Sequence, residues 1–355
     1  MDRRIPARSL NGLVQSLLQG VGVPTEDAAV AAEVLVGTSL NGVDTHGITR
    51  LPVYLSRLQD RQINPAPSIA RERMGASFGR VDGDNGLGQV VGARAMEFAS
   101  QMAQETGVGL VAVRRSNHFG AAGYYCAGAA QRGLVALVVT NTPPAIPPWG
   151  GRKPFFGTNP VAFGFPAPTF PIVVDLSASA VARGHIILAA QRGEPIPADW
   201  AVDEAGRPTE DPQRALQGAL LPVGGAKGYA LAVAVEMMAG VITGAAVGSG
   251  VGWMYEKTGA PADVGHFLIV FDPFRFIPPD EYEQRVSSLI EQVHGAERAA
   301  GVNEIFLPGE RRRRTREQRL KEGIPVDPKL WEELILWARR LDLDFPEPEI
   351  WESKA

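Results

Sequence analysis

Cysteine is almost absent from the 355-residue sequence, in which Cys126 is the only one. A single cysteine excludes an internal disulfide and any metal site built from cysteines alone. The first six residues, which end at Pro6, also lack the apolar core of a signal peptide. From these two features we expect a cytoplasmic protein.

An excess of positive charge is also missing. The chain has 35 Lys and Arg residues against 39 Asp and Glu residues, a formal net charge of −4. Because nucleic-acid binding usually requires a basic surface, we expect no nucleic-acid partner. The hydrophobic share of 45% and the charged share of 21% are ordinary for a soluble globular protein. A chain of this length predicts two or three subdomains around a large core.

Only one stretch approaches the length of a membrane span. Residues 229–247 carry a single charge, at Glu236. The stretch is rich in Ala and Gly and has no flanking aromatic belt, so it is only weakly hydrophobic. We therefore predict a helix buried inside the protein and no membrane partner.

The familiar nucleotide-binding motifs are missing as well. No Gly-x-Gly-x-x-Gly follows a predicted strand, and the nearest approach, residues 248–252, follows a helical pattern. The glycines and lysine of residues 224–227 lack the spacing of a phosphate loop. A conventional dinucleotide-binding fold is therefore not supported.

The most informative stretch that is present is Asp-Thr-His-Gly-Ile-Thr-Arg at residues 44–50. If a helix begins near Gly47, His46 and Arg50 lie one turn apart on the same side. An arginine fork can hold a carboxylate, while a histidine moves a proton to or from an oxygen on the adjacent carbon. A 2-keto or 2-hydroxy acid presents these two groups side by side. The alternative is a solvated helix face without function.

A second stretch with chemical potential follows a predicted strand at 108–113. The strand leads into a loop that carries His118 and then into a helix that starts with small residues, 120–123. Small residues let a ligand approach the backbone, and free amides at a helix start attract phosphate. Tight packing of the helix on the sheet explains the small residues equally well but leaves His118 unexplained.

Three further polar features remain open on the residues alone. Asp175, at the end of a predicted strand, either caps the following backbone, which we favour, or binds a ribose or an ordered water. Gly224 and Gly225 could admit a negatively charged cofactor, with Lys227 as its counter-ion or as a donor to the substrate. The basic run at 311–321 is typical of a solvated helix face, with a contact to cofactor phosphate as the alternative.

The hydrophobic pattern predicts the order of helices and strands. We expect helices at 7–19, 25–39 with Thr25 as the cap, 47–58, 88–105 and 280–293, and strands at 77–82, 108–113, 134–140, 161–165, 172–179 and 265–271. The Pro-rich residues 64–67 mark a change of subdomain. The polar residues 193–218 suggest a loop or a small lobe with little core.

Taken together, these stretches resemble the malate/L-lactate dehydrogenase family of the second type, which is distinct from the Rossmann dehydrogenases. The resemblance extends from the helices before His46 to Glu310. It depends on five motifs: Asp-Thr-His-Gly at 44–47 with Arg50, Asn-His-Phe-Gly at 117–120, Gly-Thr-Asn-Pro at 157–160, Asp-Leu-Ser at 175–177 and Gly-Ala-Lys-Gly-Tyr at 225–229. Members include ureidoglycolate dehydrogenase, sulfolactate dehydrogenase, diketogulonate reductase and piperideine-carboxylate reductase.

The resemblance implies an α/β (α+β) fold that is not Rossmann-like, with a largely antiparallel central sheet flanked by helices. It also implies a homodimer and three regions in each chain. Residues 1–65 would be helical, carry the 44–50 motif and pack with the C-terminal part. Residues 66–275 would contain the sheet and bind the cofactor, and residues 276–355 would complete the substrate and dimer domain.

The activity implied is an NAD(P)-dependent oxidoreductase that transfers a hydride between nicotinamide and C2 of a small 2-hydroxy or 2-keto acid. Malate or an L-lactate-like acid is the first expectation, and ureidoglycolate, diketogulonate or a cyclic imino acid the alternative. NAD is slightly preferred over NADP.

By the same resemblance, His46 is the proton donor, with Thr45 beside it, although some members use the counterpart of His118. Arg50 would hold the substrate carboxylate, assisted by Thr158 and Lys227. The implied cofactor contacts are His118, Phe119, Gly120, Ala121, Ala122, Thr142, Asp175, Leu176, Ser177, Lys227, Gly228, Gly309 and Glu310.

The sequence departs from the family pattern at two positions. Thr45 stands where the family usually has serine, and its hydroxyl can still donate a hydrogen bond. His185 stands where the family often has lysine, so specificity or optimal pH should differ if that position touches substrate or cofactor.

Two other classes of function compete with this interpretation. A metal-dependent hydrolase or lyase would bring together His46, His118, His185 and His266 as ligands. A non-catalytic binding protein would hold the cofactor without turnover. We predict no metal, because a histidine supplies the proton and no spaced ligand set is visible.

Overall fold

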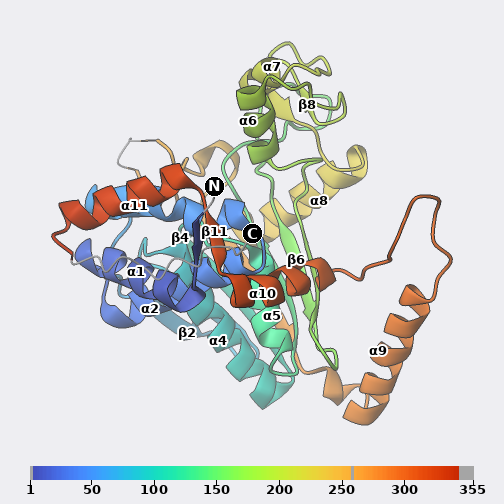
Figure 1. Cartoon of the computed structure of the whole chain (residues 1–355). Coiled ribbons are helices and arrows are strands. Elements are labelled where there is room, and N and C mark those ends of the chain that lie inside the picture. The colour runs from blue at the N-terminus through green and yellow to red at the C-terminus, as the bar shows by residue number, and fades with distance from the viewer. Residues whose placement is uncertain (1–2, 257–259, 344–355) are drawn as a thin grey trace.

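The centre of the molecule is a seven-stranded sheet (Figure 1). The computed structural model describes residues 3–256 and 260–343. The strand order is β2-β3-β4-β10-β5-β6-β7, and every neighbouring pair is antiparallel except β3 and β4. The largely antiparallel sheet implied by the resemblance is therefore confirmed. Its strands are β2 (Ala70–Arg73), β3 (Phe78–Asp82), β4 (Val108–Ser116), β5 (Val135–Thr140), β6 (Val161–Phe165), β7 (Ile172–Leu176) and β10 (Val264–Phe271).

The helices mostly lie where hydrophobic spacing predicts them. They are α1 (Ala7–Gly20), α2 (Thr25–Leu40), α3 (Leu51–Gln59), α4 (Gly88–Thr106), α5 (Ala122–Ala130), α6 (Arg183–Arg192), α7 (Pro212–Gln217), α8 (Ala226–Glu236), α9 (Pro279–His294), α10 (Glu310–Glu322) and α11 (Pro328–Arg340). Two short strand pairs complete the described chain: β1 (Arg3–Ile5) with β11 (Ile324–Val326), and β8 (Ala201–Val202) with β9 (Ala219–Leu220).

The two faces of the sheet are covered by different helices because side chains alternate along each strand. In β5, Ala136 and Val138 pack with α4 and α5. Leu137 and Val139 point to the opposite face and pack with α8 and the π-helix that follows it. The start of α5 therefore lies near the C-terminal end of β4, directly after the loop that carries His118.

A separate core joins the two ends of the described chain. It contains Leu17 and Leu18 of α1 and Trp331 and Leu334 of α11, all buried. The antiparallel pair of β1 and β11 fixes the same two segments to each other. The segment that carries the 44–50 motif thus lies between N-terminal and C-terminal helices.

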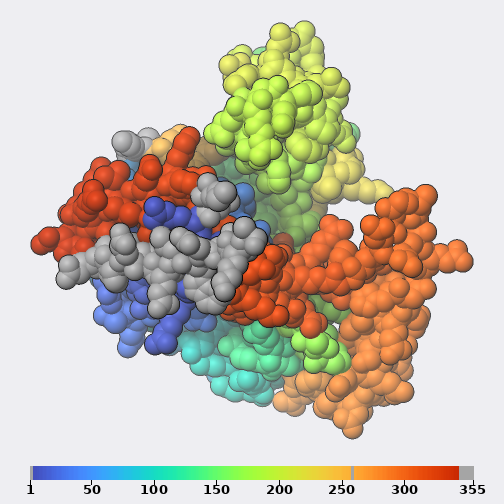
Figure 2. All heavy atoms as spheres, viewed as in Figure 1, coloured from blue at the N-terminus to red at the C-terminus, as the bar shows by residue number. Residues whose placement is uncertain are grey.

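A small lobe stands above the body of the molecule (Figure 2). It contains α6, β8, α7 and β9, and includes the polar residues 193–218. Its core consists mainly of alanines and a few larger side chains, among them Ile186, Ile196 and Leu220. The predicted small lobe with little core agrees with this packing.

The predicted buried helix at 229–247 is partly wrong. The segment is α8 followed by a π-helix, Met237–Ile242, and the side chains of Met237, Val241 and Ile242 are about half exposed. The charged residue, in contrast, is buried. The Glu236 carboxylate accepts hydrogen bonds from Asn159 Nδ2 at 2.7 Å and from Gly248 N at 2.8 Å. In the described part of the chain, no helix combines the length and the hydrophobicity that a membrane span requires.

Two predicted helix starts also need correction. The α2 helix begins at Thr25 with Pro24 as its N-cap residue, and no side chain caps it, so Thr25 is not the cap. The third helix begins at Leu51 and not near Gly47. The motif residues instead form two short 3₁₀ turns, Asp44–His46 and Ile48–Arg50.

Candidate active site

The His46 and Arg50 motif lies at the junction of α2 and α3, where Gly47 separates its two turns. Gly47 packs so closely on α2 that an added Cβ would collide with the Ser39 hydroxyl. That hydroxyl accepts a hydrogen bond from Ile48 N at 3.0 Å. The close contact requires glycine and interrupts the helix, so His46 and Arg50 are not one α-helical turn apart as predicted.

The Arg50 side chain is fixed through its Nε, and this leaves its two terminal nitrogens accessible to a ligand. Its Nε donates to the Thr45 carbonyl at 2.6 Å, and its guanidinium lies 5.7 Å from the ring centroid of Tyr255. Within the described residues, neither Nη1 nor Nη2 has a hydrogen-bond partner. The two terminal nitrogens are therefore free to bind a carboxylate with two parallel hydrogen bonds.

The structure brings His118 next to His46, although 72 positions separate them in the chain. Their ring centroids are 5.5 Å apart, with an interplanar angle of 29°. Gly120 follows in the same loop: its φ of +87° favours glycine, and a Cβ there would be in ordinary contact with the His46 carbonyl oxygen, at 3.4 Å. The two predicted histidines thus share one site.

Each histidine has one ring nitrogen fixed by a hydroxyl group. His46 Nδ1 lies 2.9 Å from Thr45 Oγ1, and His118 Nδ1 lies 2.6 Å from Tyr54 Oη. In the part of the chain that the structure describes, neither Nε2 has a hydrogen-bond partner. Each ring is oriented and still has one nitrogen that can exchange a proton with a ligand.

Burial keeps both histidines neutral at pH 7. Desolvation lowers the pKa of His46 to about 4, and the positive charge of Arg50 lowers it further. The pKa of His118 is lowered well below its ordinary value, mainly by burial and then by His46 and Arg50. A bound carboxylate beside Arg50 would offset that charge and favour the protonated imidazole.

Tyr54 belongs to this site, but sequence analysis assigned it only to the apolar side of a helix. Its side chain is buried, and burial raises the pKa of its phenol, which stays neutral at physiological pH. The available signal was spacing, because Tyr54 follows Arg50 by four residues and so lies one helical turn further along α3.

The predicted cofactor residues form a first group around the start of α5. Gly123 packs against Asp175, because a Cβ at Gly123 would lie 2.8 Å from the Asp175 carboxylate. Asp175 Oδ2 accepts a hydrogen bond from Arg312 Nη1 at 2.8 Å. The favoured capping role for Asp175 is therefore wrong, since its carboxylate forms an ion pair with α10. Ala121, Gly123, Gly309 and Arg312 all line one small hollow there.

The basic run on α10 is neither a plain solvated face nor a free anion site. Several of its arginines form ion pairs with carboxylates: Arg312 with Asp175, Arg313 with Glu317, Arg314 with Glu304, and Arg319 with Asp44. The last pair is bidentate, with distances of 2.6 and 2.9 Å. It ties α10 to the turn that carries His46.

A second group of predicted residues lies where β5, β6 and β7 meet the start of α8. Thr142 Oγ1 accepts a hydrogen bond from Thr158 N at 2.9 Å, and the Thr158 carbonyl accepts one from Ala178 N at 2.8 Å. The Ala178 carbonyl in turn accepts one from Val223 N at 2.8 Å. A Cβ at Gly228 would collide with the Val223 carbonyl, which brings the start of α8 into the same group.

The remaining predicted residues differ in their exposure and in whether their side chains already have a polar partner. Lys227 is exposed and has no ion-pair partner among the described residues, and no side chain caps the amides that begin α8. Leu176 is 41% exposed. Ser177 Oγ is 3.0 Å from Ser179 Oγ. The Glu310 carboxylate is already engaged, because it accepts from Leu307 N at 2.8 Å and lies 3.0 Å from His294 Nε2.

The structure does not assemble the four histidines of the competing metal-site hypothesis. His185 is exposed on α6 beside Trp200, and His266 is buried, with its two ring nitrogens 2.8 Å from the hydroxyls of Thr140 and Ser116. Within residues 3–256 and 260–343, no three His, Cys, Asp or Glu side chains form a cluster that could hold a metal ion. The four-histidine ligand set is therefore wrong.

The sequence is similar to known dehydrogenases over nearly its whole length. A profile described as malate/L-lactate dehydrogenase matches residues 5–335. The (2R)-3-sulfolactate dehydrogenase (NADP(+)) of Chromohalobacter salexigens is 39% identical and aligns over 95% of this chain and 99% of its own length. The ureidoglycolate dehydrogenase (NAD(+)) of Escherichia coli O157:H7 is 32% identical and aligns over 94% of this chain and 95% of its own.

A solved structure shows the same similarity at the level of the fold. The sulfolactate dehydrogenase of Methanocaldococcus jannaschii superposes with a TM-score of 0.89 and 38% sequence identity, covering 96% of this chain and 98% of its own. The range matched by the family profile, 5–335, contains the whole sheet and the residues of the two-histidine site. The chain therefore belongs to the malate/L-lactate dehydrogenase family and is an oxidoreductase.

Proposed function

We propose that this protein is an NAD(P)-dependent dehydrogenase that interconverts a small 2-keto acid and the corresponding 2-hydroxy acid. The observation that carries the proposal is the free fork of Arg50 beside two oriented histidines, each with an unengaged Nε2. This arrangement suits a carboxylate next to a carbonyl or hydroxyl group. The names of the relatives, one NADP(+)-dependent and one NAD(+)-dependent, support a nicotinamide cofactor.

In the reductive direction, Arg50 binds the C1 carboxylate and fixes the position of C2. When bound, a reduced nicotinamide cofactor would supply the hydride for C2. The electron pair of the carbonyl bond moves to the oxygen, which takes a proton from His46 and becomes the 2-hydroxyl. Thr45 orients the His46 ring, and the His118 ring stacks beside it in the same site. In the oxidative direction, neutral His46 accepts that proton.

The residues present fit a dinucleotide. No side chain caps the first amides of α5 or α8, and the start of a helix favours a phosphate group. Lys227 is exposed without an ion pair in the described part of the chain, which suits a pyrophosphate or substrate oxygen. We propose NAD slightly ahead of NADP; Asp175 is the type of side chain that binds a ribose diol, and it would do so with one oxygen already paired with Arg312. Cofactor binding would then use a mostly antiparallel, non-Rossmann sheet.

The experiment that tests this function is oxidation of NADH and of NADPH by the purified protein. The substrates to compare are oxaloacetate, pyruvate, sulfopyruvate, 2-oxoglutarate, diketogulonate and a cyclic imino acid, with malate or L-lactate-like products expected first. Turnover of at least one acid supports the proposal. Cofactor binding is monitored by fluorescence, and a protein that binds neither NADH nor NADPH contradicts the proposal.

We further propose a cytoplasmic homodimer in which residues 66–275 bind the cofactor. The shared core of α1 and α11 supports grouping residues 1–65 with 276–355. The α9 helix has no buried residue and projects from the body (Figures 1 and 2), and its neighbour Phe276 is 83% exposed. A second chain would cover these surfaces. Light scattering after size-exclusion chromatography should give twice the mass of 38.0 kDa, and a monomer at assay concentration contradicts the proposal.

A further inference from the structure

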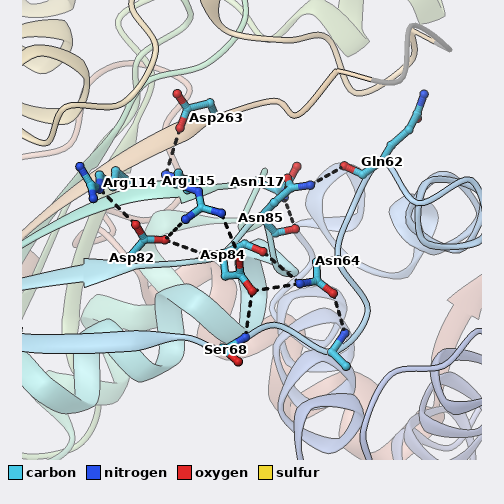
Figure 3. Close-up of polar contacts among 11 residues, drawn as sticks. Gln62, Asn64, Ser68, Asp82, Asp84, Asn85, Arg114, Arg115, Asn117 and Asp263 are labelled. Carbon is cyan, nitrogen blue, oxygen red and sulfur yellow. Dashed lines mark hydrogen bonds and ion pairs between the residues drawn. The ribbon is translucent and has the colours of Figure 1, made fainter.

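The loop that carries His118 is bound to a second loop, residues 82–88, through the buried side chain of Asn117 (Figure 3). Asn117 Nδ2 donates to Asn85 Oδ1 at 3.0 Å, to the Asn85 carbonyl at 3.2 Å and to the Gly86 carbonyl at 2.9 Å. In the opposite direction, Asn85 N donates to the Arg115 carbonyl at 2.8 Å. The residue directly before His118 is therefore fixed by bonds that involve neither histidine.

Ion pairs hold the same two loops together at the surface. Arg115 donates from Nη1 to Asp82 Oδ1 at 3.0 Å and from Nη2 to Asp84 Oδ1 at 2.9 Å. The other oxygen of Asp84 accepts from Asn64 Nδ2 and from Ser68 N, both at 3.0 Å. Figure 3 shows Asp84 between the arginine and the segment that leaves α3. Asp84 thus connects the His118 loop to the chain that follows α3.

Several residues in this network have a left-handed backbone. The φ values are +47° at Asp84, +56° at Asn85, +50° at Arg115 and +46° at Asp263. Asp and Asn tolerate this region, whereas arginine does so at a cost of about 1–2 kcal/mol. Asp263 Oδ1 accepts a hydrogen bond from Arg115 N at 3.0 Å, which stabilises that conformation. Strained backbone that its surroundings hold in place is typical of functional sites.

The first turn of α4 leaves no space for the loop to shift. A Cβ at Gly88 would collide with the carbonyl oxygens of Asn117 and His118. The backbone at 117–118 is thus confined on one side by α4 and fastened on the other by Asn85 and Gly86. A displacement of Asn117 would move His118 relative to His46 and Tyr54.

We propose that Asn117 is a positioning residue for His118 and that the Asp84–Arg115 ion pair holds its binding loop in place. The inference rests on the proposed role of His118 in the active site. Asn117 itself contacts neither substrate nor cofactor in this proposal. It acts by fixing the distance and angle of the His118 ring, and misplacement by about 1 Å can cost a rate factor of about 10².

The experiment compares two variants with a matched control. Asn117→Ala removes the amide whose two N–H groups are shared among three acceptors. Asp84→Asn keeps the side-chain shape and the tolerance for positive φ but removes the charge. Glu72→Gln is the control, because it breaks the exposed Glu72–Arg80 pair in the wall of a surface hollow that Asp84 and Arg115 also line. Each substitution is made in the full-length enzyme, once with His118 present and once together with His118→Ala. The quantities measured are kcat, KM, cofactor affinity, the pH profile and the melting temperature.

We expect Asn117→Ala to lower kcat by about 10- to 100-fold and Asp84→Asn by about 3- to 10-fold, with KM and cofactor affinity within about twofold. In the His118→Ala background both should add less than about twofold, because a residue that acts through His118 has nothing left to position. Glu72→Gln should match the parent enzyme in both backgrounds. If Asn117→Ala does not fold, Asp84→Asn decides by the same comparison.

Equal losses with and without His118 would show a merely structural role and overturn the inference. If His118→Ala is impaired but Asn117→Ala keeps the parental kcat, the positioning role alone is overturned. The same result for Asp84→Asn is decisive if Asn117→Ala does not fold. Parental kcat and cofactor affinity in His118→Ala would overturn the proposed role of His118 and the positioning inference with it.

Discussion

Replacing Arg50 by alanine should reduce kcat/KM for carboxylate substrates strongly and leave cofactor affinity nearly unchanged. The structure leaves two guanidinium nitrogens free, so the substrate carboxylate would lose two charged hydrogen bonds. At about 1.5–3 kcal/mol each, two such bonds amount to about 3–6 kcal/mol, or about 10²- to 10⁴-fold. Because Arg50 is only partly buried, we expect a loss near the lower end, about 10²- to 10³-fold.

Steady-state kinetics with the preferred acid, together with cofactor titration by fluorescence, measures both quantities. Arg50→Lys keeps the charge but loses the fork, and should fall between the alanine variant and the parent enzyme. Arg192→Ala, which removes an exposed arginine 4.0 Å from Glu194, is the control and should have no effect. Unchanged kcat/KM in Arg50→Ala would refute the reasoning, and a parallel loss of cofactor affinity would assign Arg50 to the cofactor.

Three further predictions follow from distances and burial. Arg50→Ala should raise the pKa of His46 above about 4, since the Arg50 charge is one cause that lowers it. NMR titration of the imidazole measures this pKa, and an unchanged value would contradict the prediction. Tyr54→Phe removes the 2.6 Å contact to His118 and should lower kcat by about 5- to 100-fold with little change in substrate KM; parental kcat would contradict this role. Gly120→Ala should destabilise the fold by about 1–2 kcal/mol, because φ is +87°, whereas Gly128→Ala in open space within α5 should stabilise it by about 0.5–1 kcal/mol, and equal melting temperatures would contradict both.

Local sequence patterns predicted many of the longer helices and strands, because hydrophobic spacing reports which side of an element is buried. They gave no range for β2, α6, α7 or α11. Strand β6 agrees at both ends with its predicted range, 161–165. The mostly antiparallel arrangement did not follow from spacing and came from the family resemblance. The boundary at Gly47 was missed because it depends on the distant hydroxyl of Ser39 on a packed helix.

The residues of the site were easier to predict than their partners. His46, Arg50 and His118 stood out because their side chains carry chemistry that a packed core does not require. The partner of Asp175 is Arg312, which is 137 residues away, and no local pattern reports such a pair. Similarly, the composition of 229–247 indicated a helix but not that half of Met237 faces outward.

The positioning role proposed for Asn117 could be inferred only from the folded structure. In the sequence it is one polar residue beside a histidine, and its three acceptors belong to a loop about thirty residues earlier, at Asn85 and Gly86. The strained backbone at Arg115 is likewise visible only in the folded chain. Long-range hydrogen bonds, rather than residue types, distinguish this network from an ordinary turn.

The most direct test of the central claim is transfer of deuterium from NADH or NADPH labelled at C4 to the product. The enzyme is incubated with each labelled cofactor and with oxaloacetate, pyruvate or sulfopyruvate, and the 2-hydroxy acid is analysed by mass spectrometry. The account predicts deuterium on C2 of the product, with the label lost from the cofactor and formation strongly reduced in Arg50→Ala. Unlabelled product, or no product from any acid with either cofactor, would contradict it.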